Sequence, residues 1–287
     1  MRVGIVILPE HRWWAAEPLW RMAEEYGFAH AWTYDRVGWR PPADKPWFAA
    51  VPTLTAAATV TEQIRLGSLL TDPGLKHPAH FAREITALDD ISDGRLTIGL
   101  GAGSGSEALG RPALTEQQRI DQFTEFLELL DRILVNDVTD YEGEHYSAVQ
   151  ARRSPGCVQR PRTPFVIAAD QPRTMRLAAR FGQGWLTAGR PASDEEQWWR
   201  SVAELADAFA EEADKASTRN STMDKYLCLD AGPVYSMSSV DKFQDSVGRA
   251  AELGFTDVVA HWPRPDEPYR GHESTLEKIA TEVLPEL

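Results

Sequence analysis

Short apolar runs alternate with amphipathic helical patterns along most of the chain, and this alternation predicts its secondary structure. Most of the apolar runs are continuous, which is typical of strands that are buried on both faces of a parallel sheet. Eight runs predict eight strands, which span Val3 to Leu8, His30 to Asp35, Ile64 to Leu70, Arg95 to Gly101, Pro164 to Ala169, Gly184 to Ala188, Tyr226 to Ala231 and Thr256 to His261.

Helical periodicity fills the gaps between these strands. One predicted helix starts near Pro78, and the other clear patterns span Pro18 to Tyr26, Glu116 to Leu134, Thr174 to Phe181, Glu195 to Ala216 and Val240 to Leu253. A glycine directly follows three of these patterns, and glycine commonly ends a helix. The strand–helix repeats favour the α/β class and a closed, parallel (β/α)8 TIM barrel over an open doubly wound sheet.

Two segments before the fifth strand do not follow the repeat. The sequence DYEGEHYS, from Asp140 to Ser147, has aromatic residues around a central glycine and predicts a short hairpin. Residues Ser154 to Pro164 predict a proline-bearing connector. We therefore expect residues 1–287 to form a single (β/α)8 barrel domain, with a hairpin and connector inserted over residues 140–163.

The stretch from Leu66 to Gly105 reads as a strand, a helix, a second strand and a glycine-rich exit: LGSLLTDPGLKHPAHFAREITALDDISDGRLTIGLGAGSG. Backbone amides freed of side chains at this exit can approach an anion closely. A Rossmann nucleotide site is disfavoured, because the next helix begins only near Thr115. His77 and His80 have no carboxylate or cysteine partner in this pattern, so no metal site is expected.

Composition narrows the classes of partner. With 43% hydrophobic and 25% charged residues, the chain has enough apolar material for a large core. A net charge of -13 disfavours nonspecific binding to nucleic acid or to an anionic membrane. No apolar run reaches the roughly 18 residues of a membrane helix. Cys157 and Cys228 form no disulfide framework or zinc motif, so we expect a cytoplasmic protein without nucleic-acid or membrane partners.

Barrel enzymes carry their chemistry where strands lead into helices, and this rule selects the candidate catalytic residues. His11 and His261 could exchange a proton near neutral pH, and a packing histidine is the alternative for each. Asp35 and Glu107 are the candidate carboxylates, with a helix N-cap and an exposed loop residue as the alternatives. Four tryptophans could wall an organic substrate or pack the loops: Trp13, Trp14, Trp39 and Trp262.

Four segments carry a family pattern in order along the chain. They are Trp32-Thr33-Tyr34-Asp35, LGSLLTDP, HPAHFAREITALDDISDGRLTIGLGAG, and PFVIAADQP followed by AARFGQGW. In length and order these segments resemble the luciferase-like oxidoreductases, a family of flavin- and F420-dependent barrels. The resemblance covers residues 1 to 260, and its central block is the most specific part.

The resemblance implies an isoalloxazine or deazaflavin ring across the barrel mouth, with its phosphate tail near the loops after strands four, five and six. It also implies a bulge after strand three with a nonprolyl cis peptide behind the ring, and the matching pair here is Leu69-Leu70. The residues that it assigns to the cofactor are Asp35, Leu69, Leu70, Thr71, Gly101, Ala102, Gly103, Ser104, Asp170 and Gln171.

The chain departs from the family pattern at two positions. Many F420-dependent relatives carry Asp-His at the end of strand two, whereas this chain has Asp35-Arg36 and therefore lacks a histidine proton shuttle there. Many also carry a glycine pair after strand five, where Asp170-Gln171 adds a negative charge close to the expected phosphate.

The resemblance implies a flavin-type oxidoreductase that transfers a hydride to or from a small organic substrate, with coenzyme F420 ahead of FMN as the cofactor. With FMN, the same pocket could support a monooxygenase reaction. The alternative is a flavin- or F420-binding barrel with little or no turnover, which the missing histidine favours slightly. A homodimer is the assembly that the family suggests.

Overall fold

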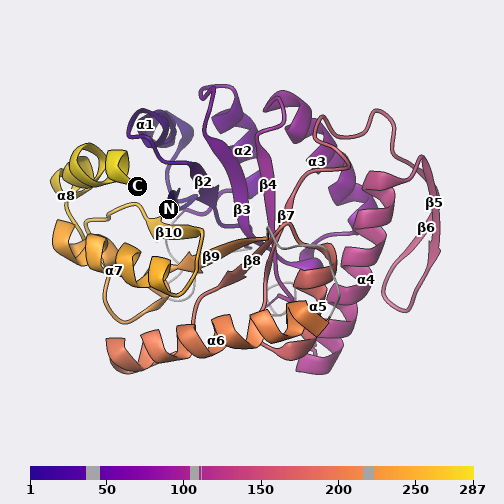
Figure 1. The fold of residues 1–287 in the computed structure, drawn as a ribbon. Helices are drawn as coiled ribbons and strands as arrows, with labels where there is room; N and C mark the ends of the chain where they lie inside the picture. The colour runs from indigo at the N-terminus through magenta and orange to yellow at the C-terminus, as the bar shows by residue number, and fades with distance from the viewer. Residues whose placement is uncertain (37–45, 104–109, 111, 216–222) are drawn as a thin grey trace.

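Parallel strands close into a barrel at the centre of the molecule (Figure 1). The structure is a computed structural model and describes residues 1–36, 46–103, 110, 112–215 and 223–287. Around the barrel the order is β1-β10-β9-β8-β7-β4-β3-β2, and each neighbouring pair is parallel, which confirms the predicted fold. The strands are β1 (Arg2–Val6), β2 (His30–Thr33), β3 (Arg65–Thr71), β4 (Leu96–Leu100), β7 (Phe165–Ala168), β8 (Gly184–Thr187), β9 (Asp224–Cys228) and β10 (Asp257–His261).

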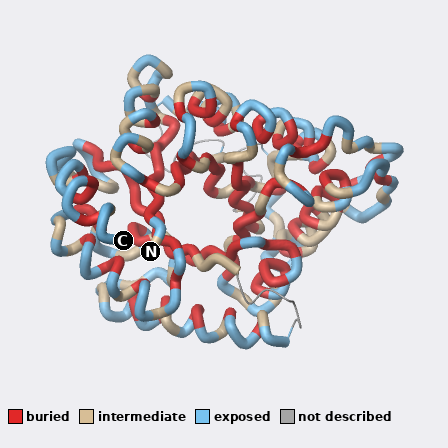
Figure 2. Tube along the Cα trace, turned by 45° about the horizontal axis from the view of Figure 1, so that its top comes forward, coloured by how far each residue is buried: buried red, intermediate tan, exposed pale blue. Residues whose placement is uncertain are grey.

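Helices cover the outside of the barrel, and Figure 2 shows buried segments inside an exposed outer layer. They are α1 (Trp13–Glu25), α2 (Ala50–Ala58), α3 (Pro78–Ile91), α4 (Glu116–Val135), α5 (Pro172–Phe181), α6 (Glu195–Lys215), α7 (Val240–Glu252) and α8 (Glu273–Lys278). Periodicity alone misses α2, because its alanine-rich sequence AVPTLTAAA has no distinct polar face. Among the described residues, no helix is both long and apolar enough to cross a membrane.

The boundaries differ from the predictions at two places that matter for the site. α1 begins at Trp13 and contains Pro18 in its interior, so Trp13 and Trp14 lie on a helix and not on a loop. β9 ends at Cys228, and Leu229–Ala231 form a 3-10 turn where the sequence predicts strand. This turn bends the chain across the barrel end and places Asp230 beside the end of β10.

The insertion forms an antiparallel hairpin that extends away from the barrel beside α4 (Figure 1). Its strands are β5 (Val138–Glu142) and β6 (Ser147–Arg152), so the hairpin is present and longer than the predicted segment. The carboxylate of Glu125 on α4 accepts backbone N–H groups from Glu144, His145 and Tyr146. These bonds attach the hairpin turn to the helix.

Apolar side chains form two layers, one inside the barrel and one between the strands and the helices. The inner layer includes Trp32, Tyr34, Leu69, Leu186 and Val259, all at most 9% exposed. The barrel interior is therefore a packed core and not a channel, as expected for this architecture.

A polar cluster lines a cavity of about 250 Å³ at the N-terminal end of the barrel interior. Asp257 is fully buried, and its carboxylate accepts both Nε and Nη2 of Arg2, at 2.9 and 2.7 Å. Nε2 of His30 lies 3.1 Å from the same carboxylate, and Nδ1 of His30 accepts Nε1–H of Trp32 at 2.6 Å. A Cβ on Gly4 would lie 1.8 Å from Nδ1 of His30, so only glycine leaves room for this ring.

Candidate functional site

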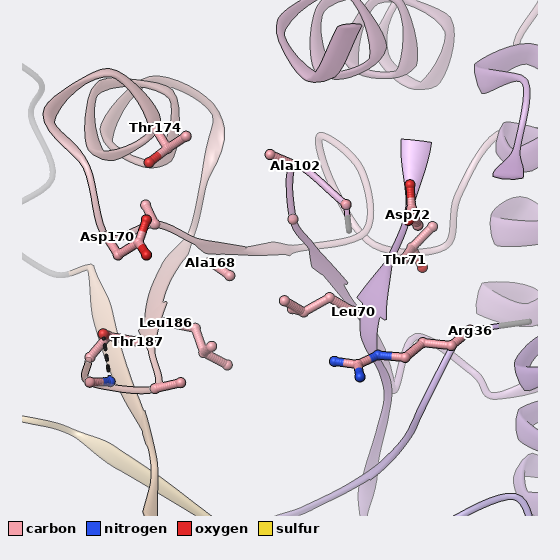
Figure 3. Close-up of a pocket in the computed structure, with 15 residues that line it drawn as sticks. Arg36, Leu70, Thr71, Asp72, Ala102, Ala168, Asp170, Thr174, Leu186 and Thr187 are labelled. Atoms are coloured by element: carbon pink, nitrogen blue, oxygen red, sulfur yellow. Dashed lines mark hydrogen bonds between the residues drawn. The ribbon is translucent and has the colours of Figure 1, made fainter. Parts of the chain in front are cut away.

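A cavity of about 300 Å³ lies at the C-terminal ends of β3, β4, β7 and β8. Figure 3 shows Leu70 and Arg36 on one side of it, and Ala168, Asp170 and Leu186 on the other. This end of the strands carries the active site in barrel enzymes. Much of its lining has little or no side chain, namely Gly101, Ala102, Gly103, Ala169, Ala188 and Gly189.

β3 carries a bulge where it reaches the cavity. The register between β3 and β4 shifts between Ser68 and Thr71, and the Leu69-Leu70 peptide bond inside this bulge is cis. The nonprolyl cis peptide is thus present at the predicted pair. Leu69 is buried in the inner core, whereas the Leu70 side chain extends into the cavity (Figure 3).

Gly101 follows β4 and has no side chain next to the bulge. A Cβ on Gly101 would lie 3.0 Å from Cδ1 of Leu70, closer than ordinary van der Waals contact, so the glycine keeps the cavity open at this point. Ala102 and Gly103 also line the cavity. Two further predicted residues of this loop, Ser104 and Glu107, lie outside the described residues.

The start of α5 forms the side of the cavity opposite Leu70 (Figure 3). Asp170 and Thr174 line the cavity there. Gln171 does not, because its side chain bonds Glu116 at the start of α4 and its carbonyl oxygen accepts the Thr174 hydroxyl at 3.0 Å. Of the predicted pair Asp170-Gln171, only Asp170 lines the cavity and can meet a ligand there.

Asp35, predicted to be both catalytic and cofactor-binding, is turned away from the cavity. Its carboxylate accepts the Thr71 hydroxyl at 2.8 Å and lies 3.6 Å from Nζ of Lys76. Burial raises the pKa of Asp35, and the nearby Lys76 charge and the Thr71 hydrogen bond partly oppose this shift. Because Thr71 lines the cavity, its hydrogen bond to Asp35 holds the bulge from the side that faces away from the cavity.

Arg36 occupies the position where the family resemblance implies a histidine. Its guanidinium extends toward the middle of the cavity beneath Leu70 (Figure 3). The guanidinium carbon lies 4.9 Å from the centroid of the Tyr34 ring. Because Arg36 lines the cavity, its guanidinium could meet negative charge on a ligand there.

His261, at the end of β10, belongs to a buried chain of hydrogen bonds. Its Nδ1 lies 3.1 Å from Oδ2 of Asp230, which also accepts the His261 backbone N–H at 2.6 Å. Its Nε2 lies 2.7 Å from the hydroxyl of Tyr34. The His261 side chain is 4% exposed and that of Asp230 is fully buried, so bulk water does not compete for these bonds.

The loop after β10 covers the hydrogen-bonded residues Tyr34, His261 and Asp230. Tyr269 stacks on the His261 ring with centroids 3.7 Å apart and hydrogen-bonds to Tyr34. Nε and Nη2 of Arg264 in the same loop donate to the two carboxylate oxygens of Glu10, both at 2.8 Å. This bidentate pair, 9% and 11% exposed, attaches the covering loop to the segment that follows β1.

The remaining predicted mouth residues lie elsewhere. His11 and Trp13 border a separate apolar cavity of about 380 Å³ between α1 and α2, and Trp14 is 77% exposed on α1. Trp262 is buried in the outer layer and stacks on Tyr26, so it packs the helices and does not line the cavity at β3 and β4. Trp39 lies outside the described residues.

Sequence reasoning selected His261 but missed three residues around it. Tyr34 stands inside the family segment at the end of β2, directly before Asp35, and a hydroxyl at a strand end was a usable signal. Asp230 was hidden because the apolar run to Ala231 reads as strand. Tyr269 lies in a loop far from any periodic segment, and no local pattern points to it.

The family model described as luciferase-like monooxygenase matches residues 1–225. The chain is 27% identical over 265 residues to a 5,10-methylenetetrahydromethanopterin reductase of Archaeoglobus fulgidus, covering 92% of this chain and 71% of that protein. It is 29% identical over 322 residues to an F420-dependent glucose-6-phosphate dehydrogenase of Beutenbergia cavernae, covering 93% and 91%. The coenzyme F420-dependent tetrahydromethanopterin reductase of Methanopyrus kandleri has the same fold, with a TM-score of 0.80, 20% identity and 99% of each chain covered. The predicted family and the oxidoreductase class are confirmed.

Proposed function

Because this chain belongs to the luciferase-like monooxygenase family, we propose that it binds coenzyme F420, with FMN as the alternative, in the cavity at β3, β4, β7 and β8. It then exchanges a hydride with a small organic substrate. The observation that carries this proposal is the bulge with Leu70 extending into a cavity that Gly101 keeps open. The two relatives described above are a reductase and a dehydrogenase by name, and the dehydrogenase is named as F420-dependent.

The cavity lining fits a flat ring with an anionic tail. Leu70, Ala168 and Leu186 supply apolar surface on its two sides, which suits the faces of a planar ring (Figure 3). Gly101 leaves backbone unshielded at the adjoining loop, where an anion can approach, whereas the Asp72 carboxylate lies against Gly103. When bound, the deazaflavin or flavin ring would accept or supply the hydride.

The residues of the chain bind, orient and shield the reacting partners. Leu70 would support one face of the ring, and Asp35 keeps the bulge in place through Thr71. Arg36 would attract negative charge on the ring or on the substrate. At the start of α5 the Asp170 carboxylate would oppose the anionic tail, and the Thr174 hydroxyl already donates to the Gln171 carbonyl oxygen.

Separate fluorescence and absorbance titrations of the purified protein with F420 and with FMN test this proposal. We expect submicromolar binding of F420 and weaker binding of FMN. Gly101→Val should weaken binding by at least tenfold, because its side chain would occupy the space beside Leu70. Gly248→Ala, on α7, where an added Cβ meets nothing within 4 Å, is the matched control. Binding of neither cofactor would overturn the proposal, and a cofactor that is held but never oxidised by substrates would favour the barrel with little turnover.

The cytoplasmic location and the homodimer remain part of the proposal. Trp14 is 77% exposed and Phe48 is 41% exposed, and large exposed apolar side chains often mark contact surfaces. Sedimentation of the purified protein at micromolar concentration tests the dimer, and a monomer under these conditions would exclude it.

A further inference from the structure

Tyr34 and Arg36 connect the cavity to the buried chain at His261. Arg36 lines the cavity, and its guanidinium lies 4.9 Å from the centroid of the Tyr34 ring. Leu70 and Leu186 line the same cavity and pack in the inner apolar cluster that contains Tyr34. The Tyr34 ring, whose hydroxyl bonds His261, therefore lies next to a residue that lines the compartment in which a substrate would meet the cofactor.

We propose that Tyr34, His261 and Asp230 form the proton relay of this enzyme, and that its substrate is an alcohol or the corresponding carbonyl compound. The inference rests on the proposed function, since it requires hydride exchange with a bound deazaflavin or flavin. When hydride leaves or reaches a carbon that bears oxygen, the oxygen must lose or gain a proton. Arg36 stands where the family resemblance implies a histidine for this purpose, and a guanidinium does not release its proton.

The hydrogen bonds fix where the protons of the relay lie. The Asp230 carboxylate accepts the His261 backbone N–H and lies 3.1 Å from Nδ1, so Nδ1 carries a proton. Its other oxygen accepts the backbone N–H of Ser236 at 2.8 Å, which holds the carboxylate in place. Nε2 can then accept the Tyr34 proton or, once protonated, donate one, because a hydroxyl can take both roles; Tyr269 is the second hydrogen-bond partner of this hydroxyl.

Alcohol oxidation balances through this relay. The substrate C–H bond breaks and hydride, with both electrons, passes to the oxidised cofactor. The substrate O–H proton passes to the Tyr34 oxygen as the Tyr34 proton passes to Nε2 of His261, and the electrons of the broken O–H bond form the C=O bond. The products are a carbonyl compound, the reduced cofactor and an imidazolium that Asp230 stabilises; carbonyl reduction is the reverse. Arg36 stabilises negative charge on the substrate oxygen.

The phenols and the thiol around the relay all have pKa values raised by burial. Burial raises the pKa of Tyr34 well above its ordinary value and Tyr269 raises it further, whereas Arg36 lowers it. Burial also raises the pKa of the Cys228 thiol on β9, to about 12. Tyr235, which donates to the His261 carbonyl oxygen at 2.8 Å, and Tyr269 both have pKa values raised by burial.

The test compares Tyr34→Phe with Tyr235→Phe, since each removes one hydroxyl beside His261 and only the first removes a relay proton. F420-loaded and FMN-loaded proteins are assayed with cyclohexanol and cyclohexanone, together with a panel of primary alcohols and aldehydes. Tyr34→Phe should lower kcat about 100-fold or more and abolish the acid limb of the pH profile for alcohol oxidation, with the cofactor Kd changed by less than about threefold. Tyr235→Phe should keep the wild-type pH profile.

Nuclear magnetic resonance of ¹⁵N-histidine-labelled protein provides a readout that needs no turnover. The Nε2 resonance of His261 should shift in Tyr34→Phe, while the Nδ1 resonance keeps the position of a nitrogen that donates to a carboxylate. An unchanged Nε2 resonance would overturn the relay.

The outcomes separate the two proposals. If the wild-type protein binds neither cofactor, the proposed function fails and the relay falls with it. If it binds a cofactor but turns over no alcohol or carbonyl compound of the panel, or if Tyr34→Phe keeps kcat and the acid limb, the relay is overturned and the proposed function stands.

Discussion

The barrel carries two buried histidine–aspartate pairs, one at each end of its interior; one contacts Trp32 on β2, and the other contacts Tyr34, directly after β2. At the N-terminal end, Asp257 holds His30, which accepts Nε1–H of Trp32 at 2.6 Å. The indole N–H can only donate, so Nδ1 of His30 must stay an acceptor and Nε2 carries the proton toward Asp257. This end is therefore fixed in one protonation pattern.

At the C-terminal end, His261 meets a hydroxyl in place of the indole. The Tyr34 hydroxyl can donate to Nε2 of His261 or accept from it, so the same three-part arrangement can pass a proton in either direction. The two ends also differ in their surroundings, because Asp257 pairs with Arg2, whereas Asp230 accepts the backbone N–H groups of Ser236 and His261. A similar pair thus serves stability at one end and is built to move a proton at the other.

The largest effect is expected from Asp257→Asn. It removes the carboxylate that bonds both the buried His30 and the half-exposed Arg2. Hydrogen bonds to a charged group contribute about 1.5 to 3 kcal/mol each, so the unfolding free energy should fall by about 3 kcal/mol or more. Chemical denaturation at pH 7 measures this loss. The kcat per folded molecule should stay at the wild-type value, and a large loss of kcat would mean that the N-terminal pair also serves catalysis.

The pH dependence of that loss follows from the Asp257 pKa. Burial raises this pKa, but hydrogen bonds from His30 and Arg2 outweigh burial and hold it below its ordinary value of 3.8. The carboxylate therefore contributes stability above pH 3.8, and the contribution is lost as the pH falls through the lower folded-state pKa. Asp224→Asn is the control, because this second partner of Arg2 is 38% exposed and should cost less than about 1 kcal/mol.

The sequence predicted the barrel well, because each strand leaves a local trace in its own apolar run. The cis peptide at Leu69-Leu70 and the glycine exit at Gly101 were also predictable, since both lie inside one continuous family segment. The hydrogen bonds at the C-terminal end of the barrel were not predictable, because Tyr34, Asp230 and His261 meet only after the strands close into a ring.

Orientation was the second feature that local patterns could not give. Asp35 and Trp262 follow strand ends, as the rule for barrel enzymes requires, but their side chains point outward to the helix layer. In a strand, successive side chains alternate between the interior and the helices, so a bulge or turn of one residue decides the direction.

The second largest effect on stability is expected from Trp32→Phe. The change removes the donor to Nδ1 of His30 and leaves space in a site that is 1% exposed, which should cost about 2 to 3 kcal/mol. Thermal unfolding measures it. The pH profile of activity should not move, in contrast to Tyr34→Phe just after the same strand, and a shifted profile would contradict the difference between the two ends.

A smaller effect is expected from Glu10→Gln at the C-terminal end. The variant weakens the bidentate bond to Arg264 and should cost about 1 to 2 kcal/mol, because both side chains are nearly buried. The loop that carries Tyr269 over His261 should then exchange its backbone amides faster in hydrogen–deuterium exchange. Glu17→Gln, which loses a solvent-exposed pair with Arg21, is the control, and equal exchange in the two variants would show that Glu10 does not hold the loop.

The smallest effect is expected from Asp170→Asn, which addresses the cavity beside the C-terminal pair. Removing this exposed carboxylate lowers repulsion toward an anionic cofactor, so F420 should bind about two- to threefold more tightly, an energy typical of exposed charges. The gain should shrink when salt is raised, because screening weakens exposed interactions first. Asp224→Asn removes the same charge at the N-terminal end and should leave the Kd unchanged at any salt concentration. Equal tightening by both variants would mean that net charge, and not the position of Asp170 in the cavity, governs binding.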